Sequence, residues 1–128
     1  MIYLDSSVAL AYLMGEERTP PVSLWRSHLV SSRLLQFEVW TRIHARGLTS
    51  SHSQLVNLLL KRVTLLEMVA PVLQRALEPF PAPVRTLDAL HLASAEFLRT
   101  QGERVTIASY DNGLVTAAKQ LGFEIADA

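Results

Sequence analysis

The 128-residue sequence contains no cysteine. Disulfide bonds and thiolate metal sites are therefore excluded, and a reducing compartment is compatible with the composition. No apolar stretch is long enough to span a bilayer. The N-terminus lacks the basic segment that begins a signal peptide, and Asp5 interrupts its first apolar run. We therefore expect a cytoplasmic protein that is not associated with a membrane.

The formal net charge is zero, because 12 Lys and Arg residues balance 12 Asp and Glu residues. Proteins that bind nucleic acid usually carry a basic surface, so this balance counts against such a function. If four acids were gathered in one site, however, the rest of the chain would carry 12 basic and 8 acidic residues, a net charge of +4. Ten of the 12 basic residues are arginine, whose planar guanidinium suits phosphate, although genomic base composition can produce the same excess.

What the sequence does contain is a series of short apolar runs separated by helical patterns. The runs predict strands at residues 2–4, 29–31, 63–69, 104–109 and 123–126. The segments between them predict helices at residues 6–16, 21–28, 32–46, 49–62, 85–102 and 111–122, and a further helix that begins at Pro71. Ser6 or Ser7 is placed to cap the first helix. We expect an α/β fold with a central parallel sheet and helices on both faces, in one domain that spans residues 1–128.

Four carboxylates stand near the ends of these elements. Asp5 and Asp111 follow predicted strands. Asp88 lies in the first turn of a predicted helix, and Glu38 lies in the first turns of another. Taken singly, Asp5 and Asp111 are explained as caps or turn residues, and Asp88 as an acid at the positive end of a helix. In open parallel sheets, however, ligands bind in one crevice beyond the carboxyl ends of the strands. The predicted fold would bring three or four carboxylates to that crevice.

Such a cluster of acids needs a counter-charge, because carboxyl groups so near to one another cannot all ionise without a cation. A hard divalent cation meets this need, since Mg²⁺ prefers oxygen ligands and keeps several waters for a substrate phosphate. The sequence shows no grouping of His and Cys that would indicate zinc. The constellation therefore predicts phosphoryl chemistry assisted by Mg²⁺ or Mn²⁺.

In the order and spacing of four segments the sequence resembles the acidic motifs of PIN-domain ribonucleases, in particular the bacterial VapC-type toxins. The segments are YLDSSVALAYL, SSRLLQFEVWTRI, RTLDALHLASA and ASYDNGLVTAAKQLGF, and the resemblance covers residues 2–125. It implies a three-layer α/β/α sandwich, an Mg²⁺ or Mn²⁺ site, endoribonuclease activity and a VapB-type antitoxin as partner. By motif position it implies the same four acids as catalytic residues and metal ligands: Asp5, Glu38, Asp88 and Asp111.

Two further positions follow from the same resemblance. Ser109 matches a Ser/Thr position of the family that helps to orient water or phosphate, which places it among the catalytic candidates. Asn112 stands where a basic or polar residue is common, a departure that affects a phosphate contact and not the metal.

Basic side chains near the acids have two explanations each. Arg42 and Arg46 share a helix face with Glu38, and Arg85 directly precedes a helix that bears one of the acids, so all three are candidates for RNA binding. Glu38 and Arg42 can equally form a plain surface ion pair. His91 lies one turn along a helix from a predicted ligand, and we interpret it as a packed structural histidine rather than as a ligand.

For partners, we expect a homodimer and an antitoxin. The antitoxin would lay a helix in an apolar groove beside the acidic crevice, with a basic side chain that reaches the carboxylates. The helices around Leu55–Leu60 and Leu34–Ile43 are candidates for that groove, whereas the first of them can equally form a dimer seam or lie in the monomer core.

Three other functions compete with a toxin nuclease. A receiver-type phosphoacceptor is disfavoured, because Asp5 is followed by two serines and the late strand ends in SYDNG without a lysine. A PIN-like module that only binds RNA or protein, and a housekeeping PIN nuclease, remain alternatives.

Overall fold

A computed structural model describes residues 1–128 and contains a five-stranded sheet in which every strand pair is parallel. The strand order is β3-β2-β1-β4-β5. The strands are β1 (Ile2–Leu4), β2 (Leu29–Ser32), β3 (Val63–Leu66), β4 (Thr106–Ala108) and β5 (Glu124–Ile125). The order reverses between β1 and β4, the position at which open parallel sheets bind ligands.

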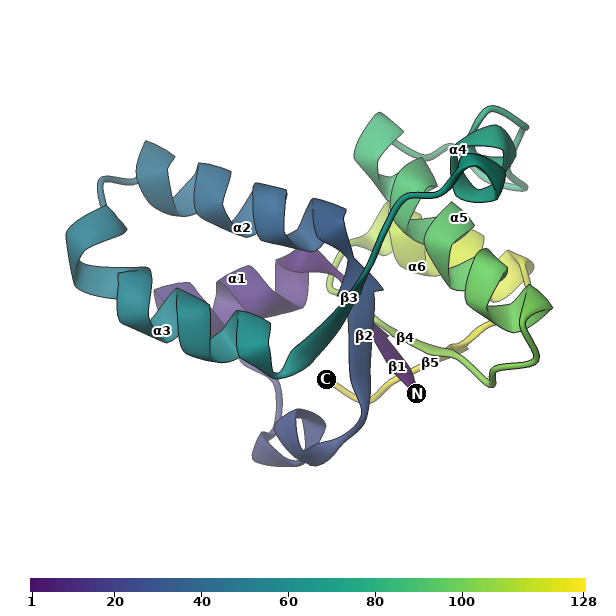
Figure 1. Cartoon of the computed structure of the whole chain (residues 1–128). Coiled ribbons are helices and arrows are strands. Elements are labelled where there is room, and N and C mark those ends of the chain that lie inside the picture. The colour runs from purple at the N-terminus through teal and green to yellow at the C-terminus, as the bar shows by residue number, and fades with distance from the viewer.

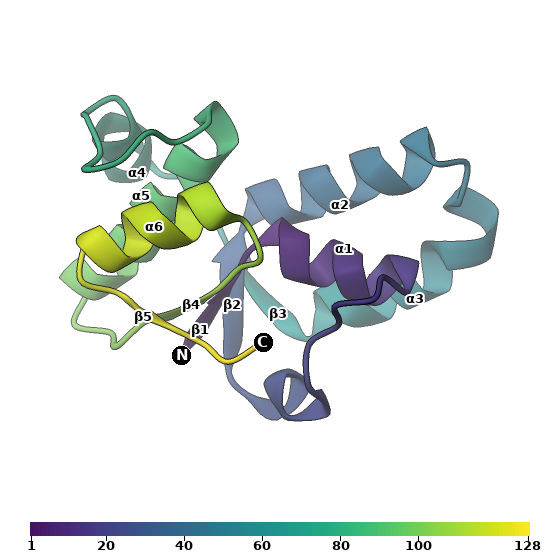
Figure 2. The same ribbon diagram turned by 180° about the vertical axis from the view of Figure 1, so that it is seen from behind.

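Helices cover both faces of this sheet (Figures 1 and 2). One layer contains α1 (Ser6–Met14), α2 (Arg33–Ala45) and α3 (Thr49–Lys61), and the other contains α4 (Ala70–Ala76), α5 (Thr86–Thr100) and α6 (Asn112–Gln120). A short 3₁₀ helix, η1 (Val22–Arg26), precedes β2. The predicted α/β/α sandwich with a central parallel sheet is therefore confirmed.

Two apolar clusters fill the spaces between the sheet and the helical layers. The first contains Leu35, Val39 and Ile43 of α2, which are fully buried together with residues of α1 and α3. The second contains Leu92 and Ala95 of α5, with residues of β1, β4 and α6. Because β1 contributes to both clusters, the residue that follows it is held firmly between the two layers.

Capping interactions fix where the helices begin and end. Asp5, and not Ser6 or Ser7, is the cap of α1, and Asp111 caps α6 by accepting the N–H of Leu114 at 3.0 Å. Gly15 ends α1 in the left-handed conformation (φ 62°), which only glycine adopts without strain, and its N–H returns to the last turn.

Two segments differ clearly from the sequence-based expectation. The strand predicted at residues 63–69 ends at Leu66, because the chain turns there into α4, which carries its proline in the first turn. The segment 21–28 forms only the five-residue η1.

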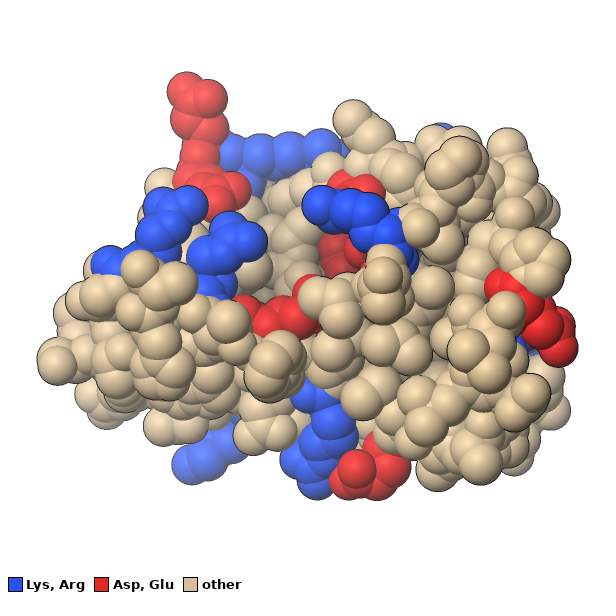
Figure 3. All heavy atoms as spheres, turned by 90° about the horizontal axis from the view of Figure 1, so that it is seen from above, with Lys and Arg blue, Asp and Glu red and all other residues tan.

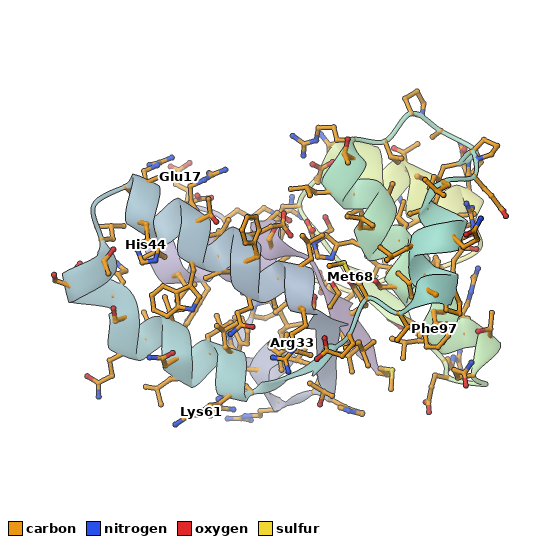
Figure 4. All side chains as sticks on the ribbon, turned by 45° about the horizontal axis from the view of Figure 1, so that its top comes forward. Glu17, Arg33, His44, Lys61, Met68 and Phe97 are labelled. Atoms are coloured by element: carbon orange, nitrogen blue, oxygen red, sulfur yellow. The ribbon has the colours of Figure 1, made fainter.

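An exposed ion pair joins the start of α2 to the residue that follows β3. Arg33 Nε lies 2.8 Å from Glu67 Oε1, and Arg33 is labelled in Figure 4.

None of the helices is both long and apolar enough to cross a membrane.

Candidate active site

A cleft of about 410 Å³ opens at the carboxyl edge of the sheet. Its lining comes from both helical layers and from the turns that follow β1 and β4. Figure 3 looks down on this edge and shows acidic side chains in a hollow that is flanked by basic side chains. The lining includes all four acids predicted from the sequence, Asp5, Glu38, Asp88 and Asp111, and two of the predicted arginines, Arg42 and Arg85.

Asp5 is held at the end of β1 by hydroxyl groups. Its Oδ2 accepts hydrogen bonds from Ser7 Oγ at 2.6 Å and Ser109 Oγ at 2.8 Å, and from the Ser7 N–H at 3.4 Å. The side chain is buried, and the backbone N–H of Asp5 donates to the carbonyl of Ala108 at 2.9 Å. All the hydrogen bonds to the carboxylate go to Oδ2, whereas Oδ1 accepts none and lies 3.9 Å from His91 Nε2.

Ser109 joins the ends of β1 and β4. Its hydroxyl donates to Asp5 and accepts the N–H of Asp111 at 3.0 Å, while Ser7 Oγ accepts the N–H of Tyr110 at 2.9 Å. The Ser109 hydroxyl therefore uses its one proton in the hydrogen bond to Asp5, so the direct effect of this serine is on the position of Asp5.

Arg85 bridges two of the acids. Its Nε donates to Asp88 Oδ2 at 3.2 Å, and its Nη2 contacts Asp111 Oδ2. Burial, and then the negative charges of Asp111 and Asp5, raise the pKa of Asp88, whereas Arg85 lowers it. Hydrogen bonding and charge from Asp88 in turn raise the pKa of Arg85. Burial, which is the largest cause, and the charges of Asp111 and Asp5 together outweigh Arg85, so the pKa of Asp88 rises.

Glu38 enters the cleft from the first turns of α2 and is held at both oxygens. Oε2 accepts from Ser6 Oγ at 3.1 Å, and Oε1 lies 2.5 Å from His91 Nε2. The other ring nitrogen, Nδ1, lies 2.8 Å from the hydroxyl of Tyr3. Burial lowers the pKa of His91, but Tyr3, the hydrogen bond with Glu38 and the charge of Asp5 raise it more, so that its pKa is about 10.

The other basic candidates are placed less centrally. Arg42 lines the cleft and forms no salt bridge with Glu38, so the surface ion pair considered from the sequence is absent. Arg46 is the C-terminal cap of α2 and lies outside the lining. As the side chains are placed, no three His, Asp or Glu residues could hold one metal ion together. Arg85 and His91 are the residues that contact the acids.

Comparison with known proteins agrees with this architecture. The sequence matches the PIN domain over residues 2–120. The chain belongs to the PIN-domain family. Ribonuclease VapC46 of Mycobacterium tuberculosis (strain ATCC 25618 / H37Rv) is 32% identical to it over 127 residues, 97% of this chain and 95% of that protein. Ribonuclease VapC47 of Mycobacterium tuberculosis (strain CDC 1551 / Oshkosh) is 29% identical over 130 residues, 96% of this chain and 93% of that protein.

Sequence reasoning missed the polar residues that hold the acids of this PIN domain. From the sequence alone, Tyr3 is part of an apolar strand and Ser7 is a candidate cap. The sequence does carry a signal for Tyr3, because a tyrosine and a histidine at buried positions both need hydrogen-bond partners. The interpretation of His91 as a packed histidine agrees with its 1% exposure, but its partner is Glu38, a residue of the cleft.

The raised pKa of Asp88 leads to a prediction for the protein in EDTA. A carboxyl group whose pKa is raised by folding destabilises the native state when it is ionised, and this cost disappears as the pH falls through the raised pKa toward 3.8. Asp88→Asn should therefore increase the free energy of unfolding by about 1 kcal/mol near pH 8, and by less as the pH approaches 4.

Urea unfolding at a series of pH values measures this difference. Asp127→Asn makes the same chemical change at an exposed position and should show no such pH-dependent gain. A loss of stability in Asp88→Asn at pH 8, or a gain that does not vary with pH, would contradict the assignment of the repulsion to this carboxylate.

Proposed function

We propose that this PIN domain is an endoribonuclease that depends on Mg²⁺ or Mn²⁺ and is the toxin of a toxin–antitoxin pair. The observation that carries the proposal is the convergence of Asp5, Glu38, Asp88 and Asp111 on one cleft at the carboxyl edge of the sheet. The relatives that carry the name ribonuclease align with nearly the whole chain, which supports an activity on RNA.

The chemistry of the cleft fits a hard divalent cation. The acidic donors are all carboxylate oxygens, which are the ligands that Mg²⁺ and Mn²⁺ prefer. Burial, and then the negative charges of Asp111 and Asp5, raise the pKa of Asp88, and a cation in the cleft would relieve the part of this cost that comes from charge. Asp5 and Asp88 would be the principal ligands, with Asp111 and Glu38 completing the set directly or through water. When bound, such a cation activates water and offsets the charge of the phosphate during an in-line displacement.

The chain's own side chains prepare the cleft for this cation. Ser7 and Ser109 hold Asp5 by Oδ2 and leave Oδ1 without a hydrogen bond, so the ligand is oriented in advance. The bonds from Ser6 and His91 do the same for Glu38. Ligands that are already ordered lose less side-chain freedom when the cation binds.

Arginine side chains provide the contacts to RNA. Arg85 has a side chain that is 78% exposed, so it is free to turn away from Asp88 and Asp111 once a cation neutralises them. Its guanidinium then suits a phosphate of the RNA backbone. Arg42 offers a second guanidinium in the cleft lining, and Arg46 extends the basic path along the end of α2.

An apolar groove away from the acids is the proposed seat of a VapB-type antitoxin. This groove encloses about 730 Å³ between α1, η1 and α3, and its apolar lining includes Trp25, Leu55 and Leu58. The candidate segment Leu34–Ile43 does not line this groove. Its residues Leu34, Leu35, Val39 and Ile43 are buried in the core, whereas Phe37 is exposed elsewhere on α2. The expected homodimer remains a prediction.

The nuclease proposal predicts cleavage of single-stranded or looped RNA to fragments with 5′-phosphate and 3′-hydroxyl ends. Asp5→Asn should lower the cleavage rate at least about 100-fold with an unchanged circular dichroism spectrum, because the variant keeps the size of the side chain but loses its charge. Asp127→Asn serves as the matched control and should cleave at the wild-type rate.

The measurement is gel-based cleavage by cleanly purified protein with Mn²⁺ and with EDTA. Undiminished cleavage in EDTA would refute the metal mechanism. An absence of cleavage on total cellular RNA with either metal would favour a module that only binds RNA or protein.

The toxin proposal predicts that expression arrests growth, and that co-expression of a small protein encoded beside this gene relieves the arrest. Leu58→Glu should weaken binding of that protein at least about tenfold, because Leu58 is 55% exposed in the apolar groove and a charge there opposes apolar burial. Leu77→Glu, at the exposed residue that follows α4, is the matched control.

Calorimetric titration of the neighbouring protein into each variant gives the two affinities. If expression is harmless in the native host that lacks the neighbouring gene, the toxin role fails and a housekeeping PIN nuclease takes its place.

A further inference from the structure

His91 forms a link between the two helical layers at the carboxyl edge of the sheet. It lies on α5, which covers one face, and its Nε2 is 2.5 Å from Oε1 of Glu38 on α2, which covers the other face. Its Nδ1 is 2.8 Å from the hydroxyl of Tyr3 in β1, the strand between the layers. The Tyr3 and His91 rings meet edge to face, with centroids 5.7 Å apart and planes at 75°. The chain Tyr3–His91–Glu38 therefore joins three elements of the fold.

The direction of these hydrogen bonds is set by their chemistry. An ionised carboxylate can only accept, so Nε2 carries a proton and donates it to Glu38. If the ring is neutral, Nδ1 accepts from the hydroxyl of Tyr3, and if it is protonated, Nδ1 donates to the oxygen of that hydroxyl. In both forms Tyr3 occupies Nδ1 and the Nε2–H points at Glu38.

This arrangement exceeds what packing of the core requires. Tyr3 and His91 are each 1% exposed, so their polar atoms need partners, and side-chain hydrogen bonds in proteins go mostly to the backbone or to water. Their hydrogen bonds instead lead to a carboxylate in the cleft, whose other oxygen is held by Ser6. A glutamate side chain is long and flexible, so it needs such contacts to keep one conformation.

We propose that Tyr3 and His91 are positioning residues that hold Glu38 as a preordered ligand for the divalent cation. The inference rests on the proposed metal-dependent function and assigns a role to two residues that do not touch the cation. Partners that orient a metal ligand typically change metal affinity 10- to 100-fold when they are removed.

The test measures Mn²⁺ affinity by electron paramagnetic resonance, without substrate. Tyr3→Phe deletes one buried oxygen and keeps the ring, and it should raise the Kd for Mn²⁺ about tenfold. His91→Leu should have at least that effect. His91→Gln should recover much of the affinity, because its amide N–H₂ can donate to Glu38 from near the position of Nε2. His28→Gln, at an exposed histidine, should bind as the wild type does.

A double-mutant cycle separates positioning from a general structural role. Tyr3→Phe should cost nothing further in a Glu38→Gln background, because the ligand that it positions is already lost. An unchanged Kd in Tyr3→Phe, or an equal loss in both backgrounds, would overturn the positioning role while leaving the metal site intact. If the wild type binds no Mn²⁺ and Asp5→Asn changes nothing, the proposed function falls together with this inference.

Discussion

The repulsion among buried carboxylates at one edge of the sheet is the constraint on which the rest of the structure depends. Asp5 and Asp88 are both buried, and the charges of Asp111 and Asp5 add to the cost of ionising Asp88. Each acid accordingly has a partner: hydroxyl groups at Asp5, a shared arginine at Asp88 and Asp111, and a histidine at Glu38. A fold that only needed stability would have no reason to gather these charges. Their retention is understandable if a cation joins them in function.

The parallel sheet makes this gathering possible with very few residues. β1 and β4 are neighbours in register, with Leu4 beside Ala108, so the residues that follow them emerge side by side. Asp5 and Asp111 each begin a helix and also line the cleft. The structural and functional explanations of these aspartates therefore do not compete. The exposed helix N–H groups and the positive end of the helix dipole favour the same charge that a cation needs.

Much of this arrangement could be predicted from sequence, because it depends on local signals. Apolar runs and caps predicted the strands and most helices, and parallel pairing then placed Asp5 and Asp111 at one edge. The contacts across the layers could not be predicted, since residues 88 positions apart form the hydrogen bond between Tyr3 and His91. Arg85 was expected at a phosphate and is found between two acids, an outcome that depends on the loop before α5. The helix predicted at residues 21–28 is only the five-residue η1, because the backbone is extended at both Pro21 and Ser27.

The account centres on one cation site formed by Asp5, Glu38, Asp88 and Asp111. A crystal soaked in Mn²⁺, with diffraction data collected at the manganese absorption edge, tests it most directly. We predict an anomalous difference peak in the cleft within about 2.5 Å of Asp5 Oδ1 and Asp88, with Arg85 turned away from both Asp88 and Asp111. A cleft without a peak, with Arg85 still bridging the two aspartates at millimolar Mn²⁺, would contradict the account.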